Sequence, residues 1–267
     1  GGRADAALFA RGLRGWRERG FPGLGDQGGS GLGQHTKAVL EHPDFETSPA
    51  SAARAVWEKT GRKGAANGAV MRTAVTGIPF FWDMATVREN TRSFCEATHA
   101  DPRCLASCSV VADCVARLLQ AAASGADADV EQLLEASVLG AEALLADSEE
   151  SCADLRRHAH VQSLEELQLD EPRGIGYTLK CLGCGTWALR RGAELGFEEA
   201  VRQVVLQGGD ADTNACVAGA LLGCRLGYGG LPQKWIGGMP YVAWLEAWVQ
   251  KLLYMLQLPV VATVAAH

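Results

Sequence analysis

Apolar residues recur along most of the chain at the three- and four-residue spacing of amphipathic helices. The clearest case lies between positions 103 and 123, where one face carries Leu105, Cys108, Val111, Val115, Leu118 and Leu119. The same spacing predicts helices over residues 5–19, 49–60, 86–96, 130–145, 177–191, 197–206 and 241–256. No stretch sustains the period-two alternation of a half-buried strand. The pattern therefore predicts an all-α fold, a compact multi-helix bundle.

Loops and polar stretches divide these helices. Glycine-rich segments at 20–33 and 61–68 predict loops. Residues 147–173 are polar and acidic, and we expect them to form an excursion on the surface. The sequence has no internal repeat and no clear linker, so we expect a single domain over residues 1–267.

Composition and charge exclude several classes of protein. With 48% apolar residues in a chain of 267, a large core is possible, and the 32 glycines follow no strict period, which excludes a fibrous protein. The net charge is -6 and no run of five basic residues occurs, so we expect no nucleic-acid partner. The longest apolar stretch, 252–266, is interrupted by Gln257 and Pro259 and is too short to span a bilayer.

The nine cysteines lie mostly inside apolar helical patterns, which predicts buried, reduced thiols. The N-terminus carries no hydrophobic signal region. Together these features favour a soluble, cytoplasmic protein with no membrane partner.

The segment richest in candidate chemistry is Gln207–Asn214, with the sequence QGGDADTN. Two carboxylates, Asp210 and Asp212, stand two residues apart and are followed by the hydroxyl of Thr213. All three are hard oxygen donors, which suit Mg²⁺ or Ca²⁺ better than Zn²⁺. A helix is expected to begin directly afterwards, so the same residues also fit an ordinary N-cap.

Small residues follow this turn at every fourth position: Ala215, Gly219, Gly223 and Gly227. Glycine inside a helix costs roughly 1 kcal/mol relative to alanine, so the stripe indicates close approach by a neighbouring helix. We therefore expect this helix to lie deep in the bundle and to hold the two carboxylates near its centre. Buried carboxylates repel each other, and a bound cation is the simplest compensation.

Four motifs resemble those of the ADP-ribosylglycohydrolase family, which includes the dinitrogenase-reductase-activating type. The segment GGDADTNACVAGALLGCRLG at 208–227 resembles the C-terminal signature, and NGAVMR at 67–72 resembles an Asn-Gly-x-x-Met-Arg segment. Thr98-His99 resembles a Ser/Thr-His motif, and GLPQKW at 230–235 resembles an Ile-Pro-x-x-Trp stretch. The motifs occur in the family's order.

The resemblance implies an all-α enzyme with two Mg²⁺ ions that hydrolyses the glycosidic bond between ADP-ribose and a modified protein side chain. The implied partner is ADP-ribose or an ADP-ribosylated protein. The metal ligands fall on Asp210, Asp212 and Thr213. The substrate contacts fall on Gly64, Ala66, Asn67, Gly68 and His99. No residue is identified as the catalytic acid or base.

The sequence departs from the family pattern at its front. The N-terminal Thr-Asp-Asp metal motif has no counterpart, since no Asp-Asp pair occurs anywhere in the chain. The helix at 5–19 resembles the family helix that follows this motif, so we expect a few tens of residues to be absent before it, by fragment definition or by degeneration. The alternative function is therefore a catalytically inactive ADP-ribose-binding or structural module of the same fold.

Two groups of cysteines resemble metal or redox sites. Cys181 and Cys184 form a Cys-x-x-Cys pair, but no second pair stands at zinc-ribbon spacing, which favours two buried helix residues. Cys95, His99, Cys104 and Cys108 form a looser group, whose irregular spacing argues against zinc.

Overall fold

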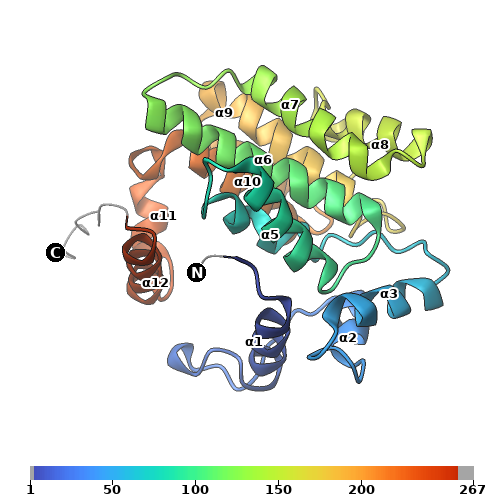
Figure 1. Cartoon of the computed structure of the whole chain (residues 1–267). Coiled ribbons are helices and arrows are strands. Elements are labelled where there is room, and N and C mark those ends of the chain that lie inside the picture. Colours follow the sequence, from blue (N-terminus) through green and yellow to red (C-terminus); the bar gives the residue numbers. More distant parts are fainter. Residues whose placement is uncertain (1–2, 258–267) are drawn as a thin grey trace. The chain divides into compact units, whose positions relative to one another are not determined.

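The computed structural model describes residues 3–257, and within that range it contains twelve α-helices, five 3-10 turns and no strand (Figure 1). The one extended pairing in the described range is an isolated antiparallel bridge between Ala66 and Tyr177. The all-α prediction is therefore confirmed. Contacts divide the chain into two compact units, residues 1–230 and 231–267, which are described separately. The single domain stays a prediction.

The first unit contains ten helices, and every helix predicted within it is present. They are α1 (Ala6–Arg19), α2 (Gln34–Leu40), α3 (Pro49–Lys59), α4 (Val70–Thr73), α5 (Met84–Glu96), α6 (Pro102–Ser124), α7 (Val130–Glu142), α8 (Glu149–Ala159), α9 (Thr178–Leu206) and α10 (Ala211–Leu226). The 3-10 turns are η1 (Pro22–Leu24), η2 (Ala74–Gly77), η3 (Ala143–Leu145), η4 (Leu164–Leu167) and η5 (Tyr228–Gly230).

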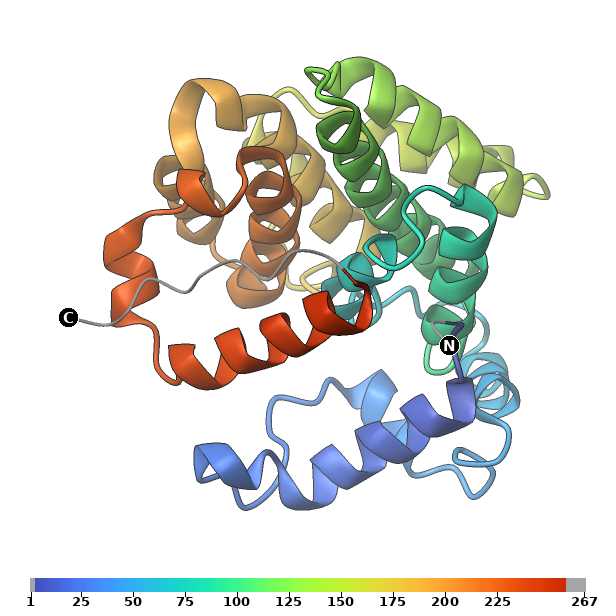
Figure 2. The ribbon, with the colours of Figure 1, turned by 60° about the vertical axis from the view of Figure 1, so that its left-hand side comes forward.

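Helix α6 is the central helix of the first unit. It packs against α5, α7, α9 and α10, and every residue from Cys104 to Ala116 is buried (Figures 1 and 2). Asp101 caps its start, Pro102 fills its first position, and Gly125 ends it in the left-handed conformation. By length and composition α6 could cross a membrane, but 78% of its apolar window is buried inside the protein, as is usual for a core helix.

Helices α9 and α10 make the most extensive helix–helix contact in the first unit (Figure 2), and the turn that carries Asp210 connects them. Helix α9 is interrupted at Gly196, where φ is +75°, so the two helices predicted at 177–191 and 197–206 are both present. The residues that permit close approach lie on α9. A Cβ atom at Gly192 would stand 2.0 Å from Leu222 Cδ1, and one at Gly185 would stand 2.7 Å from Val217 Cγ1.

The interpretation of the small-residue stripe on α10 is wrong. Ala215, Gly219 and Gly223 are only half-buried, and Gly227 ends the helix with φ +68°. The buried face of α10 instead carries larger residues, among them Val217, Ala218, Leu221 and Leu222. The spacing of the small residues located one face of α10, but it did not show which face of α10 packs against α9. The glycines that allow the close approach belong to α9.

The expected surface excursion at 147–173 is also wrong. This stretch folds into α8 and η4, and it buries Leu155, Ala159, Val161, Leu164, Leu167 and Leu169. Its many charged residues occupy the outward face, and its few leucines form a narrow stripe that packs on α9. Residues 147–173 are therefore an amphipathic segment, which their polar composition did not indicate.

The second unit contains α11 (Gln233–Gly238) and α12 (Val242–Met255), which confirms the helix predicted at 241–256. Neither helix has a buried residue, although α12 is strongly apolar. Within α12 the rings of Trp244 and Trp248 meet edge to face, 5.9 Å apart. Most of the apolar stretch at 252–266 lies outside the described residues, which end at 257.

Candidate functional site

The loop at 61–69 is fixed to the start of α9 by its backbone. The Asn67 amide donates to the Gly176 carbonyl at 2.9 Å, and the Thr178 amide donates to the Ala65 carbonyl at 3.0 Å. These bonds flank the isolated bridge between Ala66 and Tyr177. A loop without secondary structure of its own is thereby held in one conformation by a rigid helix.

Asn67 connects this loop to the Asp210 turn. Its side chain is 8% exposed, and its Nδ2 donates to Asp210 Oδ2 at 2.6 Å, across 143 positions of sequence. A hydrogen bond to a carboxylate is shorter and stronger than one between neutral groups. The two segments singled out in the sequence, the Asn-Gly loop and the Asp-x-Asp-Thr turn, therefore lie together.

The Asp210 turn presents two carboxyl groups at the start of α10. Asp210 is half-buried and Asp212 is exposed, so the expectation that both lie near the centre of the bundle is wrong. Gly208 and Gly209, with φ of +73° and +67°, bring the turn to the end of the helix pair instead of its middle. Asp210 occupies the N-cap position but makes no capping hydrogen bond, which argues against an ordinary cap.

The carboxyls of Asp210 and Asp212 are in direct contact. The hydrogen bond with the Asp210 carboxyl, followed by that from the Thr213 amide, lowers the pKa of Asp212. Thr213 is buried, and its hydroxyl lies 3.8 Å from Met71 Sδ, so it faces the segment that follows Asn67. A hydrogen bond between two carboxyl groups needs a proton on one of them, and a bound cation can take the place of that proton.

These side chains suit a hard cation in type and supply part of a coordination shell. Two carboxylates and one hydroxyl are oxygen ligands of the kind Mg²⁺ takes, which prefers six-coordinate geometry. Among residues 3–257, no group of three or more His, Cys, Asp or Glu side chains is arranged to hold a metal ion. The donors present therefore fit Mg²⁺ chemically, with further positions left for water or substrate.

His99 lies against Gly68 on the other side of the loop. It is 1% exposed, its Nδ1 shares a hydrogen bond with Thr98 Oγ1 at 2.8 Å, and its Nε2 has no hydrogen-bond partner. A Cβ atom at Gly68 would stand 3.2 Å from His99 Nε2, so a larger residue there would press against the imidazole ring. Burial, followed by the nearby charges of Arg72 and His35, lowers the pKa of His99 well below its usual value, which keeps the ring neutral.

Two side chains beside His99, Arg72 and His35, were not among the predicted site residues, although Arg72 ends the NGAVMR motif. The Arg72 guanidinium donates to the Gly68 carbonyl and to Thr98 Oγ1. The His35 ring lies 4.8 Å from the His99 ring, and its Nε2 is 3.0 Å from the Thr98 carbonyl oxygen. His35 comes from α2, far away in sequence, and no local pattern marks it.

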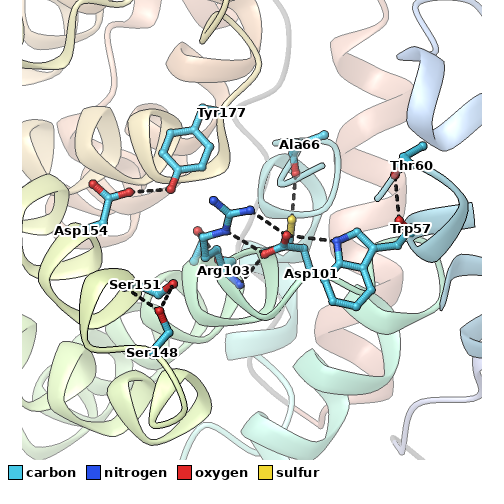
Figure 3. A network of polar contacts seen from close by, with 11 residues as sticks. Trp57, Thr60, Ala66, Asp101, Arg103, Ser148, Ser151, Asp154 and Tyr177 are labelled. Atoms are coloured by element: carbon cyan, nitrogen blue, oxygen red, sulfur yellow. Dashed lines mark hydrogen bonds and ion pairs between the residues drawn. The ribbon is translucent and has the colours of Figure 1, made fainter. Parts of the chain in front are cut away.

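A network around Asp101 supports the loop from below (Figure 3). Asp101 is 2% exposed and accepts hydrogen bonds from the Arg103 guanidinium, at 2.8 and 2.9 Å, and from Trp57 Nε1, at 3.1 Å. In the same region Cys104 Sγ donates to the Ala66 carbonyl at 3.2 Å. Asp101 was not predicted, because its partners come from α3 and α6, and the sequence offers only its position before a proline as a cap signal.

Of the predicted substrate contacts, Ala66, Asn67, Gly68 and His99 are therefore gathered in one region. Gly64 lies at its edge and is half-buried; a Cβ atom there would stand 4.0 Å from His35 Nδ1. The ligand roles of these residues stay predictions, as do those of Asp210, Asp212 and Thr213.

The cysteines form no second site in the described part of the chain. All nine are free, and Cys95, Cys104, Cys108, Cys114, Cys181 and Cys184 are buried, which agrees with the predicted burial of the thiols. Cys181 and Cys184 are core residues of α9. Within residues 3–257, Cys95, His99, Cys104 and Cys108 do not form a group of three or more side chains that could hold a metal ion.

Comparison with known proteins identifies the family. The family model described as ADP-ribosylglycohydrolase matches residues 1–259. ADP-ribosylarginine hydrolase Tri1 of Serratia proteamaculans (strain 568) is 24% identical over 259 residues, which cover 95% of this chain and 62% of that protein's length. A solved structure described as an ADP-ribosylglycohydrolase-related protein complex is similar over 91% of this chain and 71% of its own, with 27% identity and a TM-score of 0.58. The chain belongs to the ADP-ribosylglycohydrolase family.

Proposed function

We propose that this chain contributes the Asp210 turn and the Asn67 loop to a Mg²⁺-assisted ADP-ribosyl hydrolase, which cleaves the bond between ADP-ribose and a modified protein side chain. The observation that carries the proposal is the 2.6 Å hydrogen bond from Asn67 Nδ2 to Asp210 Oδ2. It joins the turn in which the sequence predicted a cation site to the glycine-containing loop in which it predicted substrate contacts.

Each part of the site has a chemical task in this reaction. Asp210 and Asp212, with the Thr213 hydroxyl, would hold Mg²⁺. When bound, the metal orients the ribose hydroxyls and activates a water molecule. The backbone amides of the loop, with Asn67, bind the diphosphate and ribose, because glycine permits close approach to the oxygens. Neutral His99 has an unpaired Nε2 that is buried behind Gly68, so it would contact substrate only if the Gly68 loop moves aside.

The test is release of ADP-ribose from ADP-ribosylated proteins in Mg²⁺. The substrates include proteins modified on arginine, because the relative from Serratia is named for that linkage. We expect turnover that chelation of Mg²⁺ abolishes, and we expect Asp210→Ala and Asp212→Ala to lose it. Asp147→Ala, which removes an exposed carboxylate elsewhere, is the matched control. Undiminished turnover in the Asp210 and Asp212 variants would contradict the proposal.

The second candidate is a catalytically inactive ADP-ribose-binding module. It is favoured by the small number of metal ligands, because no group of three or more His, Cys, Asp or Glu side chains converges within the described residues. Calorimetry separates the two functions. Binding of ADP-ribose that needs no Mg²⁺, together with no turnover of any substrate, would identify the module. A purely structural role predicts neither binding nor turnover.

A further inference from the structure

The loop at 168–176 touches both halves of the proposed site. At one end, the Gly176 carbonyl accepts the Asn67 amide at 2.9 Å. At the other end, a Cβ atom at Gly209 would stand only 2.0 Å from the carbonyl oxygen of Leu169. Gly209 directly precedes Asp210, and its φ is +67°. This loop therefore contacts both the Asn67 loop and the Asp210 turn and helps to place them.

The loop has little regular structure to hold its shape. It consists of successive turns, in which Glu171 N donates to the Gln168 carbonyl at 3.2 Å and Gly174 N donates to the Glu171 carbonyl at 3.0 Å. Gln168 has φ +46°, a left-handed conformation that a non-glycine residue adopts at an energetic cost. A segment of this kind needs contacts from outside itself to remain in one conformation.

Lys180 supplies such contacts from the first turn of α9. Its side chain is buried, and Nζ donates to the Gln168 carbonyl at 2.7 Å and to Glu171 Oε2 at 2.9 Å. A Cβ atom at Gly174 would stand 2.8 Å from this Nζ, so the loop closes around the ammonium group. Lysine is almost never buried without a partner, and here both of its recorded acceptors belong to the loop.

We propose that Lys180 is a positioning residue, which acts through the 168–176 loop to keep Asn67 and Asp210 within hydrogen-bonding distance. The expected effect of Lys180 on ADP-ribose binding rests on the proposed function. The expected effect of Lys180 on the position of the loop does not. The polar contacts of Lys180 are with Gln168 and Glu171 and not with Asn67 or Asp210, so its influence is indirect. A second contact holds the end of this loop, because Tyr177, which follows Gly176, donates its hydroxyl to Asp154 at 2.5 Å (Figure 3).

The experiment replaces Lys180 by methionine, which keeps the apolar stem and removes the donor. Hydrogen exchange then follows the Asn67 amide, whose acceptor is Gly176. We expect this amide to exchange at least about tenfold faster in Lys180→Met, while the amides of α6 keep their wild-type rates. ADP-ribose affinity is expected to fall about tenfold, because small displacements of positioning groups weaken a site strongly. Lys59→Met, at an exposed position of α3, is the matched control for both measurements.

Lys180→Arg is the conservative variant, and it is expected to restore at least half of the lost protection at Asn67. If Lys180→Met does not fold, Glu171→Gln provides the test, since Glu171 is half-exposed and carries one of the two acceptors. Wild-type exchange at Asn67 in a folded variant would overturn the role of Lys180. Wild-type protein that neither binds nor hydrolyses ADP-ribosylated substrates would overturn the proposed function alone, because the exchange measurement still decides the positioning role.

Discussion

Gly183 of α9 lies directly against Leu167 of η4. A Cβ atom at position 183 would stand 2.6 Å from Leu167 Cδ2 and 2.9 Å from the carbonyl oxygen of His158. The missing side chain is what allows the α8–η4 segment to sit on α9. Because Leu169 and the 168–176 loop follow η4 in the chain, this contact also helps to place the backbone beside the proposed site.

We predict that Gly183→Ala destabilises the protein. The added methyl group meets a backbone oxygen that cannot move away cheaply, and overpacking of this kind typically costs about 1–3 kcal/mol. Better helix propensity offsets roughly 1 kcal/mol of that cost. Urea unfolding should therefore show a lower midpoint with an unchanged slope.

Gly12→Ala is the matched control, since Gly12 lies inside α1 with nothing within 4 Å of its ideal Cβ. Here the gain in propensity has no opposing clash, and we expect stabilisation of about 0.5–1 kcal/mol. Equal shifts of the midpoint in the two variants would contradict the packing described for Gly183.

A second prediction tests the burial of the stretch that looked like a surface excursion. Leu167 is 1% exposed, and Leu167→Ala should lower the free energy of unfolding by about 2–5 kcal/mol through a cavity and lost apolar burial. Leu139→Ala, at a position 60% exposed, should change it by less than about 0.5 kcal/mol. If both variants unfold at the wild-type denaturant concentration, this segment is not part of the core.

Much of the fold could be predicted because helix periodicity is a local property. Helix α6 was visible from its apolar spacing, and its limits agree with the cap at Asp101 and the glycine at 125. Which faces are buried depends on neighbours distant in the chain. The α10 stripe was misread for this reason, because Gly185 and Gly192 of α9 provide the close approach. Composition alone likewise misjudged residues 147–173.

The residues of the candidate site likewise fall into those that the sequence predicted and those that it did not. Asn67, His99 and Asp210 were found through motifs, and the structure adds that Asn67 and Asp210 are hydrogen-bonded. His35 and Lys180 were missed, since each works through partners that only the fold brings near. Polar residues that support a site at a distance leave no periodic or spacing signal in a single sequence.

A third prediction concerns pH. The folded-state pKa of His99 is well below its usual value because the ring is buried and lies near Arg72 and His35. In the unfolded chain the ring titrates near pH 6.5. The contribution of His99 to the free energy of unfolding is therefore fully present above about pH 6.5. It declines as the pH falls, by up to about 1.4 kcal/mol per pH unit, until the pKa of His99 in the folded protein is reached.

The check is chemical unfolding at several pH values between 7.5 and 5.5. In His99→Gln the side chain stays neutral throughout. We therefore expect the free energy of unfolding to fall less steeply as the pH is lowered, with a slope smaller by up to about 1.4 kcal/mol per pH unit. His35 and His158, whose pKa values are also lowered, mainly by burial, should contribute to the remaining slope. A His99→Gln variant with the wild-type pH dependence would show that this ring does not titrate on unfolding.

The last prediction uses the contact between Asp210 and Asp212 to test for a cation. Without divalent metal, the hydrogen bond with the Asp210 carboxyl lowers the pKa of Asp212, so Asp212→Asn should lower the free energy of unfolding only slightly, by less than about 1 kcal/mol because Asp212 is exposed. With Mg²⁺ at ten times its dissociation constant, the wild type should gain about 1.4 kcal/mol, and the variant should gain much less. The difference in melting temperature between wild type and variant should thus widen on adding Mg²⁺. Asp147→Asn, with an exposed carboxylate elsewhere, should keep the wild-type response. An Asp212→Asn variant that gains as much from Mg²⁺ as the wild type would rule out Asp212 as a metal ligand, whatever the outcome of the turnover assay.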